Sequence, residues 1–347
     1  MPISNNVIIF MNFWPKGGMR HYSDAIVNVI SNTNKVVYFS NYKSNINCSN
    51  EIVWLSLNPL DIRNYAGLVY IVYYLFKTKN KTIHLNSGYP ILFFIYPLFY
   101  FFNSIITIHD AVSHKGESFL KKIVHKMQLV AYSLFFKKII VHSDIIKRQL
   151  PSFINRNKIF VIPHINYNHL FQNNHAKGLS VKNKFTVLFF GRILEYKGLK
   201  YLINAFNNLD ENKYELIIAG EGDIGIHINK KNIKVINRFI SDSEIPNLFN
   251  NTDVVVVPYI EASQSGVIYL SFAYSKPVIA TNVGSLDDIV NDGENGYVVR
   301  PKSSRELFLA IKKISNPLVY SKFTNNIKNV EISSNSYIEN KLNNLYK

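Results

Sequence analysis

The feature that most constrains this chain is a repeated alternation of short apolar, β-branched runs with longer segments of helical periodicity. Residues 7–11 form one such run, a polar glycine-containing loop follows, and apolar residues then recur at helical spacing from residue 25. Further runs lie at residues 36–40, 105–108, 139–141 and 160–162. Short runs of this kind are typical of strands buried on both faces of a parallel sheet. The pattern predicts an α/β fold.

A second series of the same kind begins at residue 186, after a polar, asparagine-rich stretch at 166–184. The run TVLFF precedes a helical pattern at 198–209, and the strand-like YELIIAG, IKVIN, DVVVV and PVIAT follow with helical segments among them. A chain of 347 residues exceeds the size at which a single core keeps growing. We therefore predict two Rossmann-like, doubly wound parallel-sheet domains facing across a cleft, at residues 1–175 and 176–330. A C-terminal helix at 331–347 is expected to pack back on the N-terminal domain.

The net charge of +16 is unevenly distributed. Residues 1–175 hold 18 Lys/Arg against 6 Asp/Glu, a balance of +12, and residues 176–347 hold 21 against 17, a balance of +4. Such asymmetry favours an anionic partner for the N-terminal domain, which could be a nucleic acid, a phosphorylated substrate or an anionic membrane surface. No recognised nucleic-acid motif accompanies the charge, so a nucleic-acid-binding protein ranks last.

The same half of the chain bears on localisation. The single Cys48 excludes an internal disulfide framework, and the first residues carry no signal-like segment, so a reducing, cytoplasmic setting is expected. The apolar run at 91–102 is interrupted by Pro97 and is shorter than the roughly 20 residues that cross a bilayer. Residues 119–138 read either as a core-packing helix with charged ends or as a helix lying in a membrane interface. With the +12 balance, we expect peripheral contact with the anionic inner face of the cell membrane.

Two segments of the second domain could bind phosphate. GRILEYKG, at 191–198, places Arg192 and Lys197 beyond a strand, with Gly191 permitting a tight turn. These cations could clamp a diphosphate, although basic loops after strands are common. Farther along, Ser265-Gly266-Val267 opens a helix, whose free N–H groups and partial positive charge suit a phosphate. Alone, that stretch is equally a plain βαβ unit with a polar N-cap.

Taken together, several motifs in order resemble the family-4 retaining glycosyltransferases of the GT-B fold, over about residues 186–301. They are GRILEYKGLKYLINAF, LIIAGEGD, SDSEIPNLFNNTDVVVVPY and EASQSGVIYLSFAYSKPVIATNVGSLDDIVNDGENGYVV. The resemblance implies an enzyme that moves a sugar from a nucleotide-diphosphate sugar to a glycan or a polyprenyl-diphosphate-linked acceptor in cell-surface polysaccharide synthesis. Another GT-B enzyme, a phosphorylase or an epimerase, is the alternative, and release of sugar without an acceptor would distinguish it.

The resemblance also assigns residues to the donor. It implies that Arg192 and Lys197 bind the diphosphate as catalytic residues, next to Gly191. It implies further that the helix beginning at Ser265, Gly266 and Val267 binds the same group through its N-terminus.

Other donor contacts follow from the same resemblance. Arg238, Phe239 and Ile240 fall where family members hold the nucleobase, largely through backbone atoms. Glu261 matches the first glutamate of a paired motif near the hydroxyls of the transferred sugar. The second glutamate, which commonly holds the ribose, is absent, because its expected places hold Tyr269 and Leu270.

In the N-terminal domain, Gly17-Gly18 resembles the family's first glycine loop, which faces the donor phosphates and the acceptor. TIHDAVSH places His109, Asp110 and His114 after a strand, and the resemblance places His109 near the reacting carbon. The alternatives are a flexible connecting loop and a structural histidine.

Two further histidines follow strands, and one common metal signature is missing. His142 and His164 end IIVH and FVIPH, and we assign them structural or supporting roles. No Asp-x-Asp of the kind that holds Mg²⁺ or Mn²⁺ follows a strand. We therefore expect a metal-independent enzyme whose only small-molecule requirement besides the acceptor is the nucleotide-sugar donor.

Overall fold

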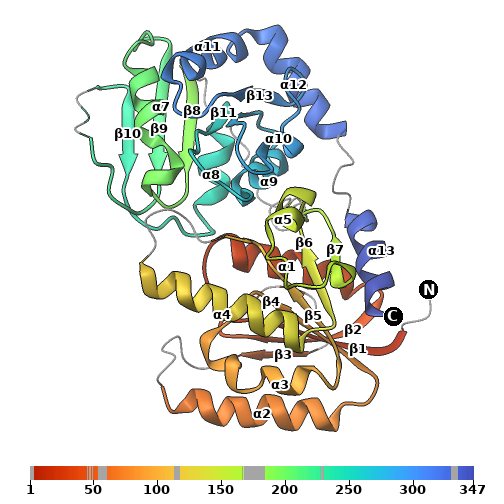
Figure 1. Ribbon diagram of the computed structural model, residues 1–347. Coiled ribbons are helices and arrows are strands. Elements are labelled where there is room, and N and C mark those ends of the chain that lie inside the picture. Colours follow the sequence, from red (N-terminus) through yellow and green to blue (C-terminus); the bar gives the residue numbers. More distant parts are fainter. Residues whose placement is uncertain are drawn as a thin grey trace. The chain divides into compact units, whose positions relative to one another are not determined.

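The computed structural model describes residues 4–44, 46, 48, 50–53, 61–112, 118–165, 167, 184–226, 228, 230–329 and 335–347. The chain divides into two compact units (Figure 1). The N-terminal unit comprises residues 1–113, 117–165 and 333–347, and the C-terminal unit comprises residues 114–116 and 166–332. The predicted linker at 166–184 and His114 lie almost wholly outside the described residues.

The N-terminal unit is built on a seven-stranded, all-parallel sheet of order β3-β2-β1-β4-β5-β6-β7. Its strands are β1 (Ser4–Asn12), β2 (Asn34–Ser40), β3 (Asn50–Val53), β4 (Lys81–Asn86), β5 (Asn103–Thr107), β6 (Lys138–Val141) and β7 (Ile159–Val161). The strand order reverses between β1 and β4. In open parallel sheets, ligands bind beyond the carboxyl ends of the strands at such a reversal.

Helices cover both faces of this sheet. They are α1 (Gly18–Ile30), α2 (Arg63–Lys77), η1 (Pro90–Phe94), α3 (Tyr96–Phe99), α4 (Phe119–Phe135), α5 (Asp144–Gln149), η2 (Arg156–Lys158) and α13 (Asn335–Tyr346). Because parallel crossovers are right-handed, α1 lies on one face and α2, α3 and α4 on the other. One hydrophobic core joins the second group of helices to alternate strand residues.

The last helix, α13, belongs to the N-terminal unit and packs beside α1. Its Tyr346 is buried, and the phenol oxygen lies 2.8 Å from Nδ1 of His84 on β4. Asn6 on β1 donates a hydrogen bond from Nδ2 to the Tyr346 carbonyl oxygen at 3.0 Å. The far end of the chain thus completes the α1 side of this sheet.

The C-terminal unit is built on a six-stranded, all-parallel sheet of order β10-β9-β8-β11-β12-β13. Its strands are β8 (Phe185–Phe190), β9 (Tyr214–Ala219), β10 (Ile233–Ile236), β11 (Val254–Val257), β12 (Val278–Thr281) and β13 (Gly296–Val299). The helices are η4 (Glu195–Lys197), α7 (Leu199–Phe206), α8 (Ile245–Asn250), α9 (Gly266–Ala273), α10 (Leu286–Ile289), α11 (Ser304–Ile314) and α12 (Pro317–Asn329). Here the order reverses between β8 and β11, which brings the loops after these two strands together.

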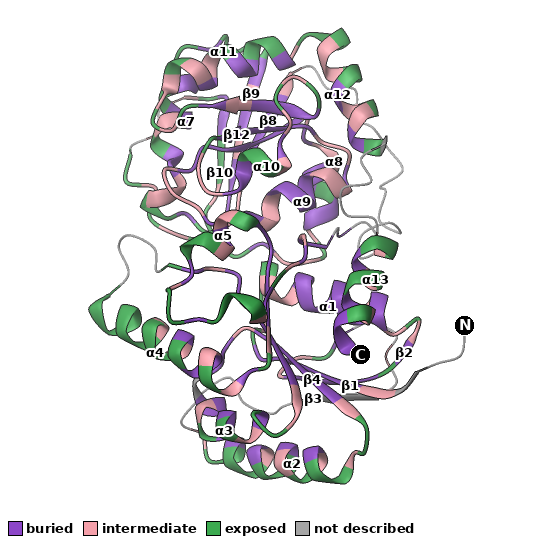
Figure 2. Ribbon diagram, turned by 45° about the vertical axis from the view of Figure 1, so that its right-hand side comes forward, coloured by how far each residue is buried: buried purple, intermediate pink, exposed green. Residues whose placement is uncertain are grey.

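Both sheets are largely buried, whereas the helices expose one side (Figure 2). The four valines of β11 are all buried, as expected for a central parallel strand. The prediction of an α/β chain with two Rossmann-like parallel sheets is confirmed. No helix within the described ranges is both long and apolar enough to span a bilayer.

Candidate functional site

The loop after β8 brings three of the predicted donor residues together. Gly191 has a φ of 104°, a conformation that favours glycine. A Cβ added there would lie 3.1 Å from Nζ of Lys197 and 3.9 Å from Cγ2 of Val267. The absence of a side chain at Gly191 therefore leaves room for the lysine ammonium beside the first turn of α9. Arg192, the next residue, has an exposed side chain.

This loop is held against the end of β11. Gly198 is left-handed, with a φ of 66°, and a Cβ added to it would lie 2.0 Å from the carbonyl oxygen of Pro258. The backbone N–H of Ile260 donates to the carbonyl oxygen of Tyr196 at 2.7 Å. The two loops at the strand reversal are thus packed backbone to backbone, which fixes where Lys197 emerges.

Tyr259 links the lysine to the start of α9. Nζ of Lys197 lies 5.2 Å from the centroid of the Tyr259 ring, within the range of a cation–π interaction. The Ser265 hydroxyl lies 3.4 Å from the Tyr259 hydroxyl and, within the described chain, makes no capping bond to α9. The first N–H groups of a helix have no intrahelical acceptors. Gly266 adds no side chain in front of them, and its nearest neighbour is the Tyr167 hydroxyl, 3.3 Å from an added Cβ.

The loop that carries Glu261 is braced by the loop after β12. The Thr281 hydroxyl donates to the carbonyl oxygen of Tyr259, and the Ser285 hydroxyl donates to that of Ser263, each at 2.7 Å. Gly284 approaches the same loop closely, since a Cβ added to it would lie 1.9 Å from the Ala262 carbonyl oxygen. Glu261 is half-buried on this braced loop.

The predicted nucleobase loop is organised by an ion pair. Arg238 donates from Nη1 and Nη2 to the two carboxylate oxygens of Glu244 at 3.0 and 2.6 Å. Glu244 also accepts from the backbone N–H and the hydroxyl of Ser241. Hydrogen bonds from Arg238 and Ser241 lower the pKa of Glu244 to about 2. The Arg238 side chain is thus engaged in shaping the loop, while Phe239 is exposed and Ile240 is buried.

No carboxylate lies at the positions expected for the family's second glutamate. Tyr269 and Leu270 lie in α9 and are both buried. Burial, with Asp288 nearby, raises the pKa of the Tyr269 phenol. Both side chains serve the packing of the helix whose first turn faces Lys197.

In the N-terminal unit, the glycine pair opens α1 directly after the loop that follows β1. Gly17 is the N-cap residue, with a φ of 68°, and α1 begins at Gly18. A Cβ added to either residue would meet no described atom within 4 Å. Gly17 is therefore required by its backbone conformation, and the pair leaves the helix N-terminus unobstructed.

His109 follows β5 and is buried, and both of its ring nitrogens contact other side chains. Nε2 lies 2.7 Å from Oδ1 of Asn86, and Nδ1 lies 3.2 Å from Nε2 of His142. Nδ1 of His142 lies 3.0 Å from the carbonyl oxygen of Ile162. Asn86 ends β4, and the other three residues follow β5, β6 and β7, so the chain of contacts crosses the carboxyl edge of the sheet.

One tyrosine ring packs against all three of the histidines that follow β5, β6 and β7. Tyr22 on α1 packs edge-on against the rings of His109, His142 and His164, with centroids 4.8, 5.1 and 4.9 Å away. Burial lowers the pKa of all three, to about 4 for His142. All three rings are therefore neutral near pH 7.

Neutral rings restrict the tautomers. A carbonyl oxygen only accepts, so His142 carries its proton on Nδ1 and accepts at Nε2. The amide oxygen of Asn86 faces Nε2 of His109, and its amide nitrogen donates to the Ser23 hydroxyl at 2.5 Å. Both ring nitrogens of His109 are thus engaged, one by Asn86 and the other by His142.

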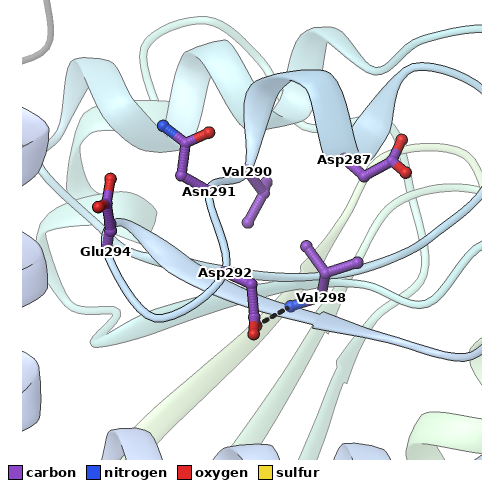
Figure 3. Close-up of a pocket in the computed structure, with 6 residues that line it drawn as sticks. All are labelled: Asp287, Val290, Asn291, Asp292, Glu294 and Val298. Carbon is purple, nitrogen blue, oxygen red and sulfur yellow. Dashed lines mark hydrogen bonds between the residues drawn. The ribbon is translucent and has the colours of Figure 1, made fainter.

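A separate hollow lies between α10 and β13 (Figure 3). It is lined by Asp287, Val290, Asn291, Asp292, Glu294 and Val298. Asp292 accepts a hydrogen bond from the backbone N–H of Val298 at 2.9 Å. The hollow is shallow and contains none of the predicted site residues. Across the described ranges, no group of three or more His, Cys, Asp or Glu side chains is arranged to hold a metal ion.

Comparison with known proteins relates the part of the chain that contains Lys197 to a known family. Residues 184–316 match the family described as glycosyl transferases group 1. This match covers less than half of the chain. The match contains every predicted site residue of the C-terminal unit.

Curated relatives match this chain over part of their length. An uncharacterised glycosyltransferase of Methanocaldococcus jannaschii is 30% identical over 187 residues, 52% of this chain and 50% of the relative. A Klebsiella pneumoniae protein described as an uncharacterised 41.2 kDa protein in the cps region is 35% identical over 120 residues, 34% of this chain and 33% of the relative. The chain thus spans between a third and a half of the length of these relatives.

Solved structures extend the likeness to both units. A Rickettsia africae glycosyltransferase has 19% identity and a TM-score of 0.71, and the match covers 99% of this chain and 98% of that one. The Anabaena protein HepE, solved with UDP and glucose, has 17% identity and a TM-score of 0.72, over 97% and 98% of the two chains. The predicted GT-B fold class is confirmed.

Sequence reasoning missed the residues that hold the donor loops in place. Tyr259, Thr281 and Ser285 make the bonds described above, but their residue types do not mark them as functional. The sequence marks these residues only through their neighbours, in the YIE segment at 259–261 and the glycine loop TNVGS at 281–285. The assignments of individual residues to donor or acceptor stay predictions.

Proposed function

We propose that this protein is a retaining glycosyltransferase that moves a sugar from a nucleotide-diphosphate sugar to a glycan or lipid-linked acceptor in cell-surface polysaccharide synthesis. The observation that carries the proposal is the convergence of Gly191, Lys197 and Val267 at the strand reversal of the C-terminal unit. A cation, a glycine backbone and a helix N-terminus together suit a diphosphate. HepE, a structural neighbour, has been solved with UDP-glucose.

Two relatives support the cellular role. The Klebsiella protein is described by its place in a cps region, and a Staphylococcus aureus relative, 28% identical over 148 residues, is named a capsular polysaccharide biosynthesis glycosyltransferase. The name of the Staphylococcus aureus protein concerns capsular polysaccharide. By analogy, we assign this chain to the assembly of such a polysaccharide, at the inner face of the cell membrane.

The proposed chemistry is a front-face transfer. The bond from the anomeric carbon to the diphosphate oxygen breaks while a bond to the acceptor hydroxyl forms on the same face, and the acceptor proton passes to the departing diphosphate. Arg192, Lys197 and the start of α9 offset the charge that develops on the leaving group. Because these groups supply positive charge, we propose that donor binding needs no metal ion. Glu261 would hold hydroxyls of the transferred sugar.

His109 is proposed to act as a neutral, oriented group and not as a proton acceptor. Its nitrogens are already engaged by Asn86 and His142, and burial lowers its pKa. It would shape the surface against which the sugar or acceptor lies, next to the Gly17-Gly18 loop. Ala substitution of His109 should therefore reduce transfer without abolishing it, and added imidazole should not restore activity.

A binding panel tests the proposal. Calorimetry with UDP-, GDP-, ADP- and dTDP-sugars should identify a donor, and Lys197→Ala should weaken its binding at least tenfold. Lys200→Ala is the matched control, because Lys200 is an exposed lysine three residues away whose ammonium lies over Tyr201. If no nucleotide sugar binds, or if both variants bind equally, the donor site is wrong. Sugar release at the full turnover rate without an acceptor would favour a phosphorylase or an epimerase.

A further inference from the structure

The exposed apolar side chains of this protein are concentrated on one layer of helices. Of the 27 large hydrophobic residues exposed in the described chain, twelve lie on α2 and α4, whereas the whole C-terminal unit has six. Apolar patches larger than those of an ordinary surface mark sites of interaction. We propose that the outer face of α2, α3 and α4 binds an anionic lipid bilayer, and that α2 is its principal contact. The inference deepens the proposed membrane location and rests on it.

The helix α2 has two apolar faces with different roles. Leu68, Ile71 and Leu75 are buried in the core of the N-terminal unit. On the other face, Tyr65, Val69, Tyr73 and Phe76 recur at helical spacing and are 48%, 69%, 54% and 66% exposed. A surface helix normally carries polar residues opposite its core face. The outer stripe of α2 is therefore suited to burial against something outside the described chain.

Aromatic contacts join the three helices into one surface. The ring of Phe76 at the end of α2 lies 5.8 Å from that of Phe102, just after α3. The ring centroid of Phe99 in α3 lies 5.4 Å from that of Phe136, just after α4. All three helices cover the same face of the sheet, away from α1 and α13 (Figure 1). Exposed Leu120 and Met127 on α4 extend the apolar surface.

The charge around α2 and α4 distinguishes among the possible partners of this surface. Residues 62–143 hold ten Lys/Arg and only two Asp/Glu, and neither α2 nor α4 contains an acidic residue. Lys77 ends α2 with its ammonium 5.4 Å from the centroid of the Tyr73 ring, and Lys121, Lys122 and Lys126 are exposed on α4.

Such a pattern matches a bilayer interface. Tyrosine rings and lysine stems lie at headgroup depth, while aliphatic side chains reach the acyl boundary. Anionic headgroups neutralise the lysines, whereas a second copy of the same surface would bring like charges together. The occupant is therefore an anionic membrane, and a dimer through this face is the outcome to exclude.

Depth measurements on the full chain test the surface. In a Cys48→Ser background, a nitroxide is attached at Phe76→Cys on α2 or, as control, at Tyr337→Cys, which is 45% exposed on α13. On vesicles containing 30% phosphatidylglycerol, the label at 76 should lie below the lipid phosphates and the label at 337 should remain in water. A water-exposed label at 76 on vesicle-bound protein would overturn the proposal. Immobilisation of that label without vesicles would show self-association instead.

Partitioning of the protein between water and vesicles separates the electrostatic and the apolar contributions to membrane binding. Each lysine near an anionic surface contributes about fivefold to binding, so Lys121→Gln, Lys122→Gln and Lys126→Gln combined should weaken it about a hundredfold at low salt. Replacing Tyr65, Tyr73 and Phe76 with serine should weaken binding at least tenfold even at high salt. Leu309→Ser with Leu318→Ser, exposed in the C-terminal unit, should change nothing.

The donor assay separates this inference from the proposed function. Nucleotide-sugar binding without vesicles should be equal in the wild type and in all of these surface variants. If the donor assay fails while α2 still enters the bilayer, the proposed activity is wrong and the surface stands. Equal binding to neutral and anionic vesicles, or unchanged binding of both triple variants, would overturn the surface.

Discussion

Acidification should destabilise the N-terminal unit, because four buried histidines must remain neutral for it to fold. They are His84, His109, His142 and His164. Burial lowers the pKa of His84 to about 3 and that of His142 to about 4, and it also holds the pKa of His109 and His164 well below 6.5. Below pH 6.5 the unfolded chain therefore binds more protons than the folded chain, so stability falls as pH falls.

The loss can be estimated between pH 7.5 and pH 5.5. A histidine with a pKa of 6.5 when unfolded and about 4 or below when folded loses about 1.3 kcal/mol of stability over this interval, so His84 and His142 together lose about 2.7 kcal/mol. The lowered pKa values of His109 and His164 act in the same direction. Asp24 opposes this, because burial raises its pKa to about 6 and its protonation favours folding by about 0.8 kcal/mol. His84, His142 and Asp24 alone give a net loss of about 2 kcal/mol, which is a substantial part of the 5–15 kcal/mol typical of a domain, and His109 and His164 increase the loss.

Urea unfolding, followed by hydrogen exchange in peptides that cover β4 to β7, measures this unit alone. The free energy of unfolding at pH 5.5 should be at least about 2 kcal/mol below that at pH 7.5. In His142→Gln, which removes one titrating ring, the difference should shrink by about 1.3 kcal/mol. Equal stability at the two pH values, or an unchanged difference in the variant, would refute the reasoning.

Three other predictions concern the C-terminal unit. Ala substitution of Arg192 or Lys197 should lower turnover by roughly 10²–10³-fold with folding preserved, and near-normal turnover at saturating donor would remove that residue from the diphosphate site. Gly198→Ala should destabilise the protein by well over the roughly 1–2 kcal/mol of left-handed strain, because its Cβ would strike the Pro258 carbonyl oxygen. Gly225→Ala, at nearly the same φ but in open space, should cost only the strain, and equal losses in urea unfolding would contradict the clash. Activity should persist in excess EDTA; loss on chelation that Mg²⁺ or Mn²⁺ restores would show a metal requirement.

The sequence predicts ten of the thirteen strands in the described chain, because burial on both faces leaves a local signature, but it misses β3, β4 and β13. The run at 186–190 corresponds to β8, and the helical pattern at 198–209 corresponds to α7. The glycine and basic residues of GRILEYKG also indicate their loop, because a left-handed turn and a charge beyond a strand are visible in the residue types. Each of these predictions depends only on residues that are close together in the sequence.

The rest depends on packing among distant segments. Nothing in the residue types shows that Arg238 is engaged by Glu244, or that Tyr259 lies under Lys197. The sequence places His142 and His164 after strands but cannot show that Tyr22 gathers them around His109. Likewise, α2 is apolar on all sides, so its sequence alone does not reveal which stripe remains outside the core.

The central claim is that this protein transfers a sugar from a nucleotide sugar with retention of configuration. The most direct measurement is proton NMR of the linkage formed from the donor selected in the binding panel and a lipid-linked acceptor. We predict a new glycosidic bond whose anomeric configuration is that of the donor, formed at rates that fall roughly 10²–10³-fold in Lys197→Ala. A product of inverted configuration, or a donor that binds yet transfers its sugar to none of the acceptors, would contradict it.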